Sequence, residues 1–349
     1  MKQNHGGDWF AYETEYGAPP LDFSASISPL GLPEGARAAA IASLEQADRY
    51  PDPQCRALRA ALAELHGVPA ARIVCGAGAA DLIYRLVHSL RPRHALIPIP
   101  TFTEYERALR EADCMIRHFP LSESEDFKLP DSFPDAIEPG TELVFLCQPN
   151  NPTGTIADLA LMQHILQRCA DIGAVMVVDE CFLDLADAPE AYTLINALAD
   201  FTNLVILKAF TKTYAMAGLR LGYALCGDAV LAQRLDAQGQ PWAVSSPADA
   251  AGRAALQDKD YLLRLRELIQ HERPRMEHAL TDMGYRVLHG SANFLLFYSA
   301  DNALGVKLRE RGILIRDCSD FSGLKAGWYR IAIRTAEEND ALLWALREV

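Results

Sequence analysis

The 349-residue sequence lacks three features that would each define a class of protein: paired cysteines, a long apolar run and an excess of positive charge. Its eight cysteines are scattered and form no CxxC pair, which excludes a zinc framework and is typical of a reducing compartment. A formal net charge of −13 argues against a nucleic-acid partner, because a protein that binds phosphate backbones needs a basic face. We expect no metal ion, no membrane span and no signal peptide, and hence a cytoplasmic protein.

Half of the residues are hydrophobic, and their pattern is the main clue to the fold. Short apolar segments alternate with segments of helical periodicity over the first two thirds of the chain. We expect strands at 72–75, 95–99, 142–147, 174–178 and 204–207, and helices at 54–66, 81–90, 104–112 and 159–172. This alternation is typical of a mainly parallel sheet covered on both faces, so the predicted fold class is α/β.

The pattern changes near residue 258, where a long charged helix is expected to begin and to continue to about residue 283. Strands are expected at 285–288, 293–298, 313–315 and 328–333, with helices at 304–311 and 336–347. This order is typical of a smaller α+β domain. The predicted domains are an N-terminal arm at 1–30 that packs with the small domain and the substrate site, a large domain at 31–257 and a small domain at 258–349.

Lys212 is the first candidate site residue, because it closely follows an apolar strand and precedes Arg220 by eight residues. An amine attacks an aldehyde only when it is deprotonated, and burial or a neighbouring cation lowers the pKa of a lysine enough to supply that state. Arg220 could be that cation while it binds a phosphate group. Taken alone, the pair is more simply interpreted as two exposed charges in a loop.

Further candidates follow the predicted strands, at the edge where open α/β sheets bind ligands. Asp179 could bind a metal, cap a helix or hold a pyridine nitrogen protonated. Asn151 lies in an Asn-Asn-Pro-Thr-Gly segment, which is a turn in the simplest interpretation. The small residues at 78–80 would let backbone N–H groups approach a phosphate at a helix N-terminus.

Taken together and in this order, the motifs resemble the fold-type I enzymes of the aminotransferase class I/II superfamily, which carry pyridoxal 5′-phosphate (PLP), over nearly the whole chain. The resemblance implies that Lys212 binds the PLP aldehyde, Asp179 the pyridine nitrogen and Asn151 the phenolate oxygen. It also implies a homodimer with the sites at the interface. The remaining implied cofactor contacts are Arg220, Gly78, Ala79 and Ala80 at the phosphate, Phe102 stacked on the ring, Thr211 beside the lysine, and Tyr50, which would reach the cofactor phosphate of the partner subunit.

Within the superfamily, the chain most resembles the branch of histidinol-phosphate aminotransferases and threonine-phosphate decarboxylases. Two features favour the decarboxylases: the His5-Gly6-Gly7 segment with the DFSA…PLG stretch at 22–31, and Phe182, where the aminotransferases usually have tyrosine. The resemblance implies decarboxylation of L-threonine O-3-phosphate to (R)-1-aminopropan-2-yl phosphate, a precursor of the cobalamin side chain. The implied substrate contacts are His5, Gly6, Ser26, Asn151, Arg316 at the phosphate and Arg334 at the α-carboxylate.

Four positions depart from the pattern of that family: Ser26 and Ser245 each stand for asparagine, Ala209 for a hydroxyl residue and Cys181 for alanine. These changes leave open a related substrate such as phosphoserine. Transamination of histidinol phosphate also stays open, because both activities act on a phosphate monoester. A non-catalytic regulatory protein is a further alternative, although such proteins usually carry a DNA-binding module.

Overall fold

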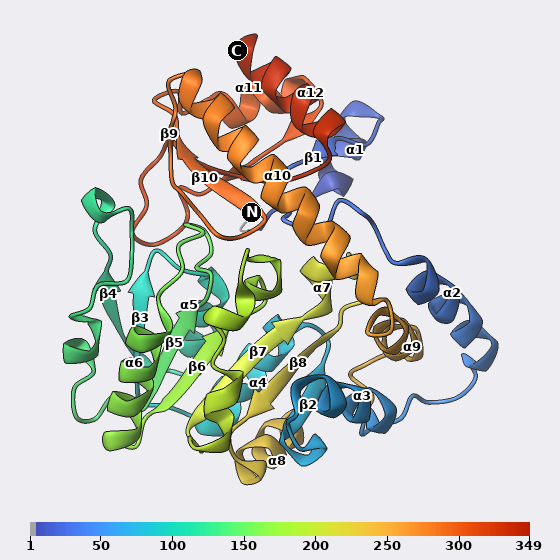
Figure 1. Cartoon of the computed structure of the whole chain (residues 1–349), viewed down its shortest axis with the longest axis vertical. Helices are drawn as coiled ribbons and strands as arrows, with labels where there is room; N and C mark the ends of the chain where they lie inside the picture. The colour runs from blue at the N-terminus through green and yellow to red at the C-terminus, as the bar shows by residue number, and fades with distance from the viewer. Residues whose placement is uncertain (1–4) are drawn as a thin grey trace.

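The computed structural model describes residues 5–349. The first four residues of the predicted N-terminal arm lie outside the described residues. The prediction that there is no signal peptide also concerns these four residues in part. A seven-stranded sheet of order β2-β8-β7-β6-β5-β3-β4 forms the larger part of the molecule (Figure 1). Its strands are β2 (Ile73–Gly76), β3 (His94–Ile99), β4 (Met115–Pro120), β5 (Leu143–Cys147), β6 (Val175–Asp179), β7 (Leu204–Ala209) and β8 (Gly222–Cys226). The strands from β3 to β7 run parallel, and β8 is antiparallel to both of its neighbours. The predicted α/β class with a mainly parallel sheet is confirmed.

The inner strands of this sheet are buried on both faces, which explains why β5 and β6 are almost entirely apolar. In β5, Val144 and Leu146 belong to the core on one face, and Leu143 and Phe145 belong to the core on the other. The first core is closed by α2 (Glu34–Ser43), α3 (Arg56–His66), α6 (Leu159–Asp171) and α9 (Ser246–Ala255). The second core is closed by α4 (Ala79–Leu90), α5 (Thr103–Glu111) and α8 (Ala229–Ala237).

A second, four-stranded antiparallel sheet of order β12-β13-β10-β9 follows the long helix α10 (Lys259–Asp282). The remaining elements of this part are β9 (Arg286–Val287), β10 (Phe294–Tyr298), α11 (Leu304–Glu310), β12 (Arg316–Asp317), β13 (Trp328–Ala332) and α12 (Ala336–Arg347). The Asp258 side chain caps α10 by accepting a hydrogen bond from the backbone N–H of Tyr261, so the helix begins where the charge pattern changes. Between residues 5 and 349, no helix is both long and apolar enough to cross a membrane.

The N-terminal segment folds against this smaller part (Figure 1). After α1 (Trp9–Tyr16), β1 (Leu21–Asp22) pairs in parallel with β11 (Ile313–Leu314), and the fully buried Phe23 accepts a backbone hydrogen bond from Ala332. The predicted strand at 313–315 is therefore divided, because β11 pairs with β1 whereas β12 pairs with β13. These contacts support an arm that packs with the small domain, and the three domain boundaries stay a prediction.

The other short elements are one-turn segments in the connections. They are η1 (Leu44–Gln46), η2 (Ala70–Arg72), η3 (Glu123–Glu125), η4 (Phe133–Ala136), η5 (Leu183–Leu185), η6 (Pro189–Ala191), η7 (Ile195–Ala199) and α7 (Phe210–Thr213). Only α7 bears directly on the candidate site, because it contains Lys212.

Candidate active site

A cavity of about 210 Å³ lies beyond the ends of β2, β5, β6 and β7 and is closed by the N-terminal arm and the small sheet. Most of the predicted site residues line it, although they come from widely separated parts of the chain. These residues are His5, Gly6, Ala79, Ala80, Phe102, Asn151, Asp179, Thr211, Lys212, Arg220 and Arg316. The cavity brings them together, and their individual roles stay predictions.

Lys212 lies in the one-turn helix α7, which begins directly after β7. Burial, followed by the nearby guanidinium group of Arg330, lowers the pKa of Lys212 to about 8. Its amine lies 5.9 Å from the centre of the Phe182 ring. A lysine in this state has a substantial neutral fraction near pH 7.5, as attack on an aldehyde requires.

The turn between β2 and α4 forms a cradle of backbone groups beside Arg220. Gly78 has φ of +92°, and a Cβ there would lie 2.7 Å from Nη2 of Arg220. A Cβ on Gly222 would lie 2.7 Å from the backbone nitrogen of Ala79. The two glycines therefore let Arg220 and the N-terminus of α4 approach each other, in the arrangement that binds a phosphate. Gly78 itself lies next to the cavity without lining it.

Asp179 ends β6 as a buried carboxylate, 4 % exposed, with a partner on each oxygen. Its Oδ2 accepts a hydrogen bond from the Tyr105 hydroxyl at 2.7 Å, and its Oδ1 accepts one from the backbone N–H of Cys181 at 3.0 Å. Burial, followed by the charge of Asp179, raises the pKa of Tyr105 well above its usual range, so Tyr105 stays the donor. A carboxylate held in this way fits the role of partner to a protonated pyridine nitrogen.

Asn151 and Phe102 lie on either side of a buried hydrogen-bond network. Asn150 accepts a hydrogen bond from the Thr101 hydroxyl at 2.8 Å and donates one to the carbonyl of Pro100 at 3.0 Å. This network ties the Asn-Asn-Pro turn to the start of α5, where Phe102 precedes the first helical residue. Asn151, 6 % exposed, accepts a short hydrogen bond from Arg330 with its side-chain oxygen.

Two arginines form the wall opposite Lys212, and one of them was not predicted. Arg330, in the middle of β13, lines the cavity and donates to the backbone carbonyl of Ser24 at 3.1 Å. Burial lowers the pKa of Arg330 to about 10, and the neighbouring charge of Arg316 acts in the same direction. Arg316 is the cross-strand partner of Arg330, and Asp320 holds its guanidinium group at 2.8 Å. The cavity therefore presents two adjacent guanidinium groups.

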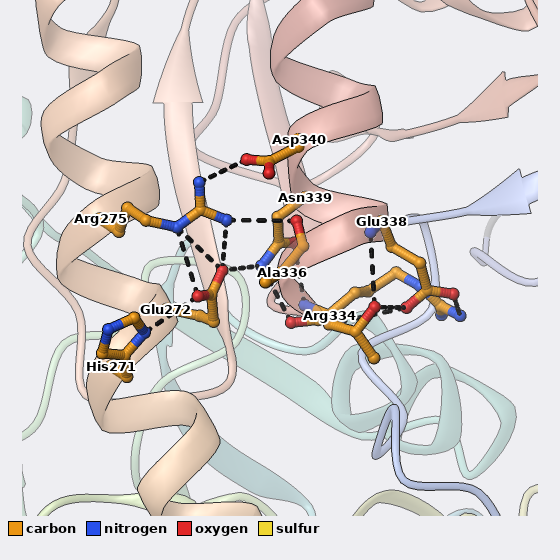
Figure 2. Close-up of polar contacts among 9 residues, drawn as sticks. His271, Glu272, Arg275, Arg334, Ala336, Glu338, Asn339 and Asp340 are labelled. Atoms are coloured by element: carbon orange, nitrogen blue, oxygen red, sulfur yellow. Dashed lines mark hydrogen bonds and ion pairs between the residues drawn. The ribbon is translucent and has the colours of Figure 1, made fainter.

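Arg334, which was predicted to bind the carboxylate, does not line the cavity. Figure 2 shows its side chain engaged with Glu338 at the start of α12. The Arg334 guanidinium donates to Glu338 at 2.6 Å and to the backbone carbonyl of Asp22 at 3.0 Å. These contacts tie α12 to the N-terminal arm and leave Arg330 as the arginine of β13 that faces Lys212.

Two other predicted residues also lie outside the cavity. Ser26 is 1 % exposed, and its hydroxyl has no hydrogen-bond partner within residues 5–349. Tyr50 is 79 % exposed and stacks on Trp242 with ring centres 4.3 Å apart. Tyr50 therefore does not reach the cavity of its own chain, which is compatible with its predicted contact to a partner subunit.

Besides Ser26, the other three departures from the family pattern can also be placed. Ala209 and Cys181 line the cavity, as does Phe182. Ser245 has a local role, since its hydroxyl caps α9 by accepting a hydrogen bond from the backbone N–H of Ala248.

Sequence reasoning missed four residues of the site: Arg330, Tyr105, Cys147 and Phe321. No local sequence pattern points to Arg330. Its place beside Arg316 follows from the register of the antiparallel strands β12 and β13.

The fold and the cavity together define an α/β enzyme of the PLP-dependent type. The glycine cradle, the lysine with a lowered pKa and the buried carboxylate fit the phosphate, the aldehyde and the pyridine nitrogen of that cofactor. Comparison with known sequences agrees: the family Aminotransferase class I and II matches residues 18–346, and the chain belongs to this family of PLP-dependent enzymes.

Individual relatives include enzymes of both activities. The chain is 38% identical to threonine-phosphate decarboxylase of Salmonella typhimurium, over 99% of this chain and 96% of the relative. It is 33% identical to histidinol-phosphate aminotransferase 2 of Archaeoglobus fulgidus, over 94% of this chain and 93% of the relative. The crystal structure of histidinol-phosphate aminotransferase from Clostridium acetobutylicum aligns with a TM-score of 0.87 and 26% identity, over 93% of this chain and 98% of that one. The predicted superfamily is confirmed.

Proposed function

We propose that this chain decarboxylates L-threonine O-3-phosphate, with (R)-1-aminopropan-2-yl phosphate as the product. The observation that carries the proposal is the pair of adjacent guanidinium groups, Arg316 and Arg330, in one cavity with Lys212. A phosphorylated amino acid has two anionic groups and an amine, and this pocket offers a cation for each anion. Histidinol phosphate has a phosphate but no carboxylate, so it would use only one of the two cations.

Arg330 is the better candidate for the α-carboxylate, in place of Arg334. It is 7 % exposed, contacts Asn151, and is the cation that contributes most to lowering the pKa of Lys212. A guanidinium group binds a carboxylate through two parallel hydrogen bonds and thereby fixes its plane. Arg330 would in this way fix the direction of the Cα–carboxylate bond relative to Lys212.

Arg316 and the N-terminal arm are the candidates for the substrate phosphate. Arg316 lines the same cavity as His5 and Gly6. Asp320 orients the Arg316 guanidinium by accepting two hydrogen bonds from one of its nitrogens, at 2.8 and 2.9 Å. A phosphate at this position would contact a fixed cation on one side and the arm on the other.

PLP, when bound, supplies an electron sink for the pair released as CO2 leaves Cα. Asp179, Asn151, Arg220 and Lys212 would hold its nitrogen, phenolate oxygen, phosphate and aldehyde. Lys212 would hold the cofactor aldehyde and has a lowered pKa, so it is the candidate to return a proton to Cα after CO2 has left. The apolar side chains of Phe102 and Phe182 help to keep water from this region of the cavity.

A homodimer with the sites at its interface is part of the proposal. At the C-terminal end of α2, Ile41 is 63 % and Leu44 58 % exposed, and the stacked pair Tyr50 and Trp242 is exposed as well. Exposed apolar side chains in this part of the chain are compatible with a surface that another subunit covers. A dimer mass in light scattering of the purified protein would support this part, and a monomer would contradict it. Cytoplasmic location stays a prediction.

The deciding experiment measures two reactions of the PLP-loaded protein. We expect CO2 and aminopropanol phosphate from phosphothreonine, with no keto acid added. We expect no glutamate from histidinol phosphate with 2-oxoglutarate. Glutamate formation, with no CO2 from phosphothreonine, would reject the proposal in favour of transamination, and faster CO2 release from phosphoserine would reassign the substrate.

A further inference from the structure

The buried carboxylate of Glu104 has no part in the proposed chemistry, although it contacts His5, which lines the cavity. Glu104 is in the first turn of α5, two residues after Phe102, and is only 8 % exposed. Its Oε1 lies 2.8 Å from Nε2 of His5, and its Oε2 accepts a hydrogen bond from the Tyr84 hydroxyl at 2.9 Å. Burying a carboxylate costs free energy unless its oxygens are paired, so a carboxylate at this position calls for an explanation.

The contacts of the arm show what Glu104 holds. A Cβ on Gly6 would lie 2.1 Å from the backbone oxygen of Ser24, so the arm approaches this segment as closely as glycine allows. The backbone N–H of Gly7 donates to the Ser24 hydroxyl at 2.8 Å, which in turn donates to Asp22 at 2.6 Å. These contacts fix residues 6 and 7 to β1, on the small-sheet side of the cavity. The His5 side chain then reaches α5 on the opposite side.

His5 thus bridges the two sides of the cavity, and Glu104 is its anchor on the large sheet. The imidazole is 49 % exposed, and besides the Glu104 contact its ring lies near Phe102, with ring centres 6.2 Å apart. The hydrogen bond from His5 is the largest cause that lowers the pKa of Glu104, ahead of the one from Tyr84. With Nε2 donating to the carboxylate, Nδ1 is the other ring nitrogen, and it donates to an anionic ligand in the cavity in the imidazolium form, in which both nitrogens carry a proton.

We infer that Glu104 is a positioning residue that holds His5, and with it the N-terminal arm, over the phosphate of the bound substrate. The inference rests on the proposed function, because it takes the ligand beneath His5 to be a phosphate monoester. Glu104 touches neither substrate nor cofactor and acts through the imidazole. Its other neighbours, Tyr84 on α4 and Arg107 on α5, contact the carboxylate and are not among the residues that line the cavity.

The test compares Glu104→Gln with a matched control, Tyr84→Phe, which removes the other partner of the same carboxylate. We expect Glu104→Gln to raise KM for phosphothreonine about fivefold to tenfold with kcat changed by less than about twofold, because the interaction acts on binding. Tyr84→Phe should change KM by less than about twofold, since it leaves the contact between His5 and Glu104 in place. A fall in kcat with KM unchanged would overturn the inference.

A double-mutant cycle with His5→Ala separates positioning from general stability. If Glu104 acts through His5, Glu104→Gln should add no further increase in KM to the His5→Ala protein. An undiminished effect in that background would show that Glu104 acts independently. The visible absorbance of bound PLP, measured for each variant, shows whether the fold and the cofactor site are intact.

A binding measurement keeps this inference separate from the proposed function. Inorganic phosphate is titrated into the PLP-loaded protein, and its affinity is expected to fall by a similar factor in Glu104→Gln and in His5→Ala. If the wild-type protein does not release CO2 from phosphothreonine, the proposed function fails, but this titration still decides the role of Glu104. Equal affinity for phosphate in the wild type and in Glu104→Gln would overturn the inference.

Discussion

The wall of the cavity that contains Lys212 belongs to a single sheet, whereas the opposite wall is assembled from three distant segments. Asn151, Asp179 and Lys212 all follow neighbouring strands of the seven-stranded sheet. The other wall takes its residues from the start of the chain, from the segment after β1 and from the small sheet. Parallel strands in register bring their carboxyl ends together automatically, while the second wall depends on how the arm packs on the small sheet.

This difference matches the two tasks of a PLP enzyme that acts on a particular substrate. The cofactor has a constant structure, and the residues expected to hold it lie at the ends of neighbouring strands, which fix their positions. The residues expected to bind the substrate lie on segments outside the large sheet, and the sequence of these segments can change without disturbing that sheet. The crystal structure of histidinol-phosphate aminotransferase from Clostridium acetobutylicum shares this fold. Under the proposed function, the two proteins would differ in substrate at the second wall.

The largest effect is expected from removing the centre of the first wall. Lys212→Ala should lower kcat by about 10³-fold or more, because both the attachment of PLP and the candidate proton donor are lost. Borohydride reduction should trap PLP on the wild-type protein and not on the variant, as mass spectrometry of the digested protein would show. Lys325→Ala changes an exposed lysine and serves as the control. A variant that retained activity would revive the regulatory alternative.

The second effect compares Arg330, at the other wall, with Arg334, which lies four residues further on and outside the cavity. Arg330→Lys should lower kcat/KM by about 10²-fold, because lysine cannot form the two parallel hydrogen bonds to a carboxylate. Arg334→Lys should leave kcat/KM within about threefold and instead lower the free energy of unfolding by about 1 kcal/mol, through its partly exposed pair with Glu338. Kinetics and urea unfolding of both variants provide the measurement. The reverse pattern would restore Arg334 as the carboxylate ligand.

The same contrast between the walls explains what could be predicted from the sequence. Asp179 ends β6, and Asn151 and Lys212 lie a few residues after β5 and after β7, which begins with four apolar residues before Lys208. Local pattern was therefore enough to place them at strand ends. Arg330 and Arg334 belong to one short segment, and only the pairing of β13 with β12 shows which of them lies beside Arg316. Long-range register of this kind leaves no local signal in the sequence.

The fold was predictable to a similar extent. Strands buried on both faces were found, whereas β4 was missed because it is a partly exposed edge strand that contains Arg117 and His118. The antiparallel β8 was missed because it begins at Gly222, just after Arg220 in a left-handed conformation, where the sequence is typical of a turn. The early helices α1 and α2 were not predicted; α1 packs by its aromatic residues rather than by a helical apolar stripe.

A pH dependence tests whether the second wall influences the first. The rate at which the PLP-free protein captures PLP should increase with pH and level off above about 8, because only the neutral amine of Lys212 reacts. At pH 7, the neutral fraction would exceed that of an ordinary lysine by about 10²-fold. Burial is the main cause of the lowered pKa and Arg330 the second, so Arg330→Leu should move the plateau to higher pH. Stopped-flow absorbance gives the rates, and a plateau that does not move would show that the two walls are electrostatically independent.

The smallest effect concerns a third wall that would come from another subunit. Tyr50→Phe should raise the dissociation constant of PLP by about tenfold or less, which corresponds to the loss of one hydrogen bond to the phosphate. The Tyr50 ring can still stack on Trp242 in this variant, so the protein should keep its oligomeric state. Tyr16→Phe changes an exposed tyrosine of α1 and is the matched control. The prediction fails if the protein is a dimer and Tyr50→Phe binds PLP as tightly as the wild type. In that case the cofactor site is complete within one chain, and only the two walls that this chain provides take part in it.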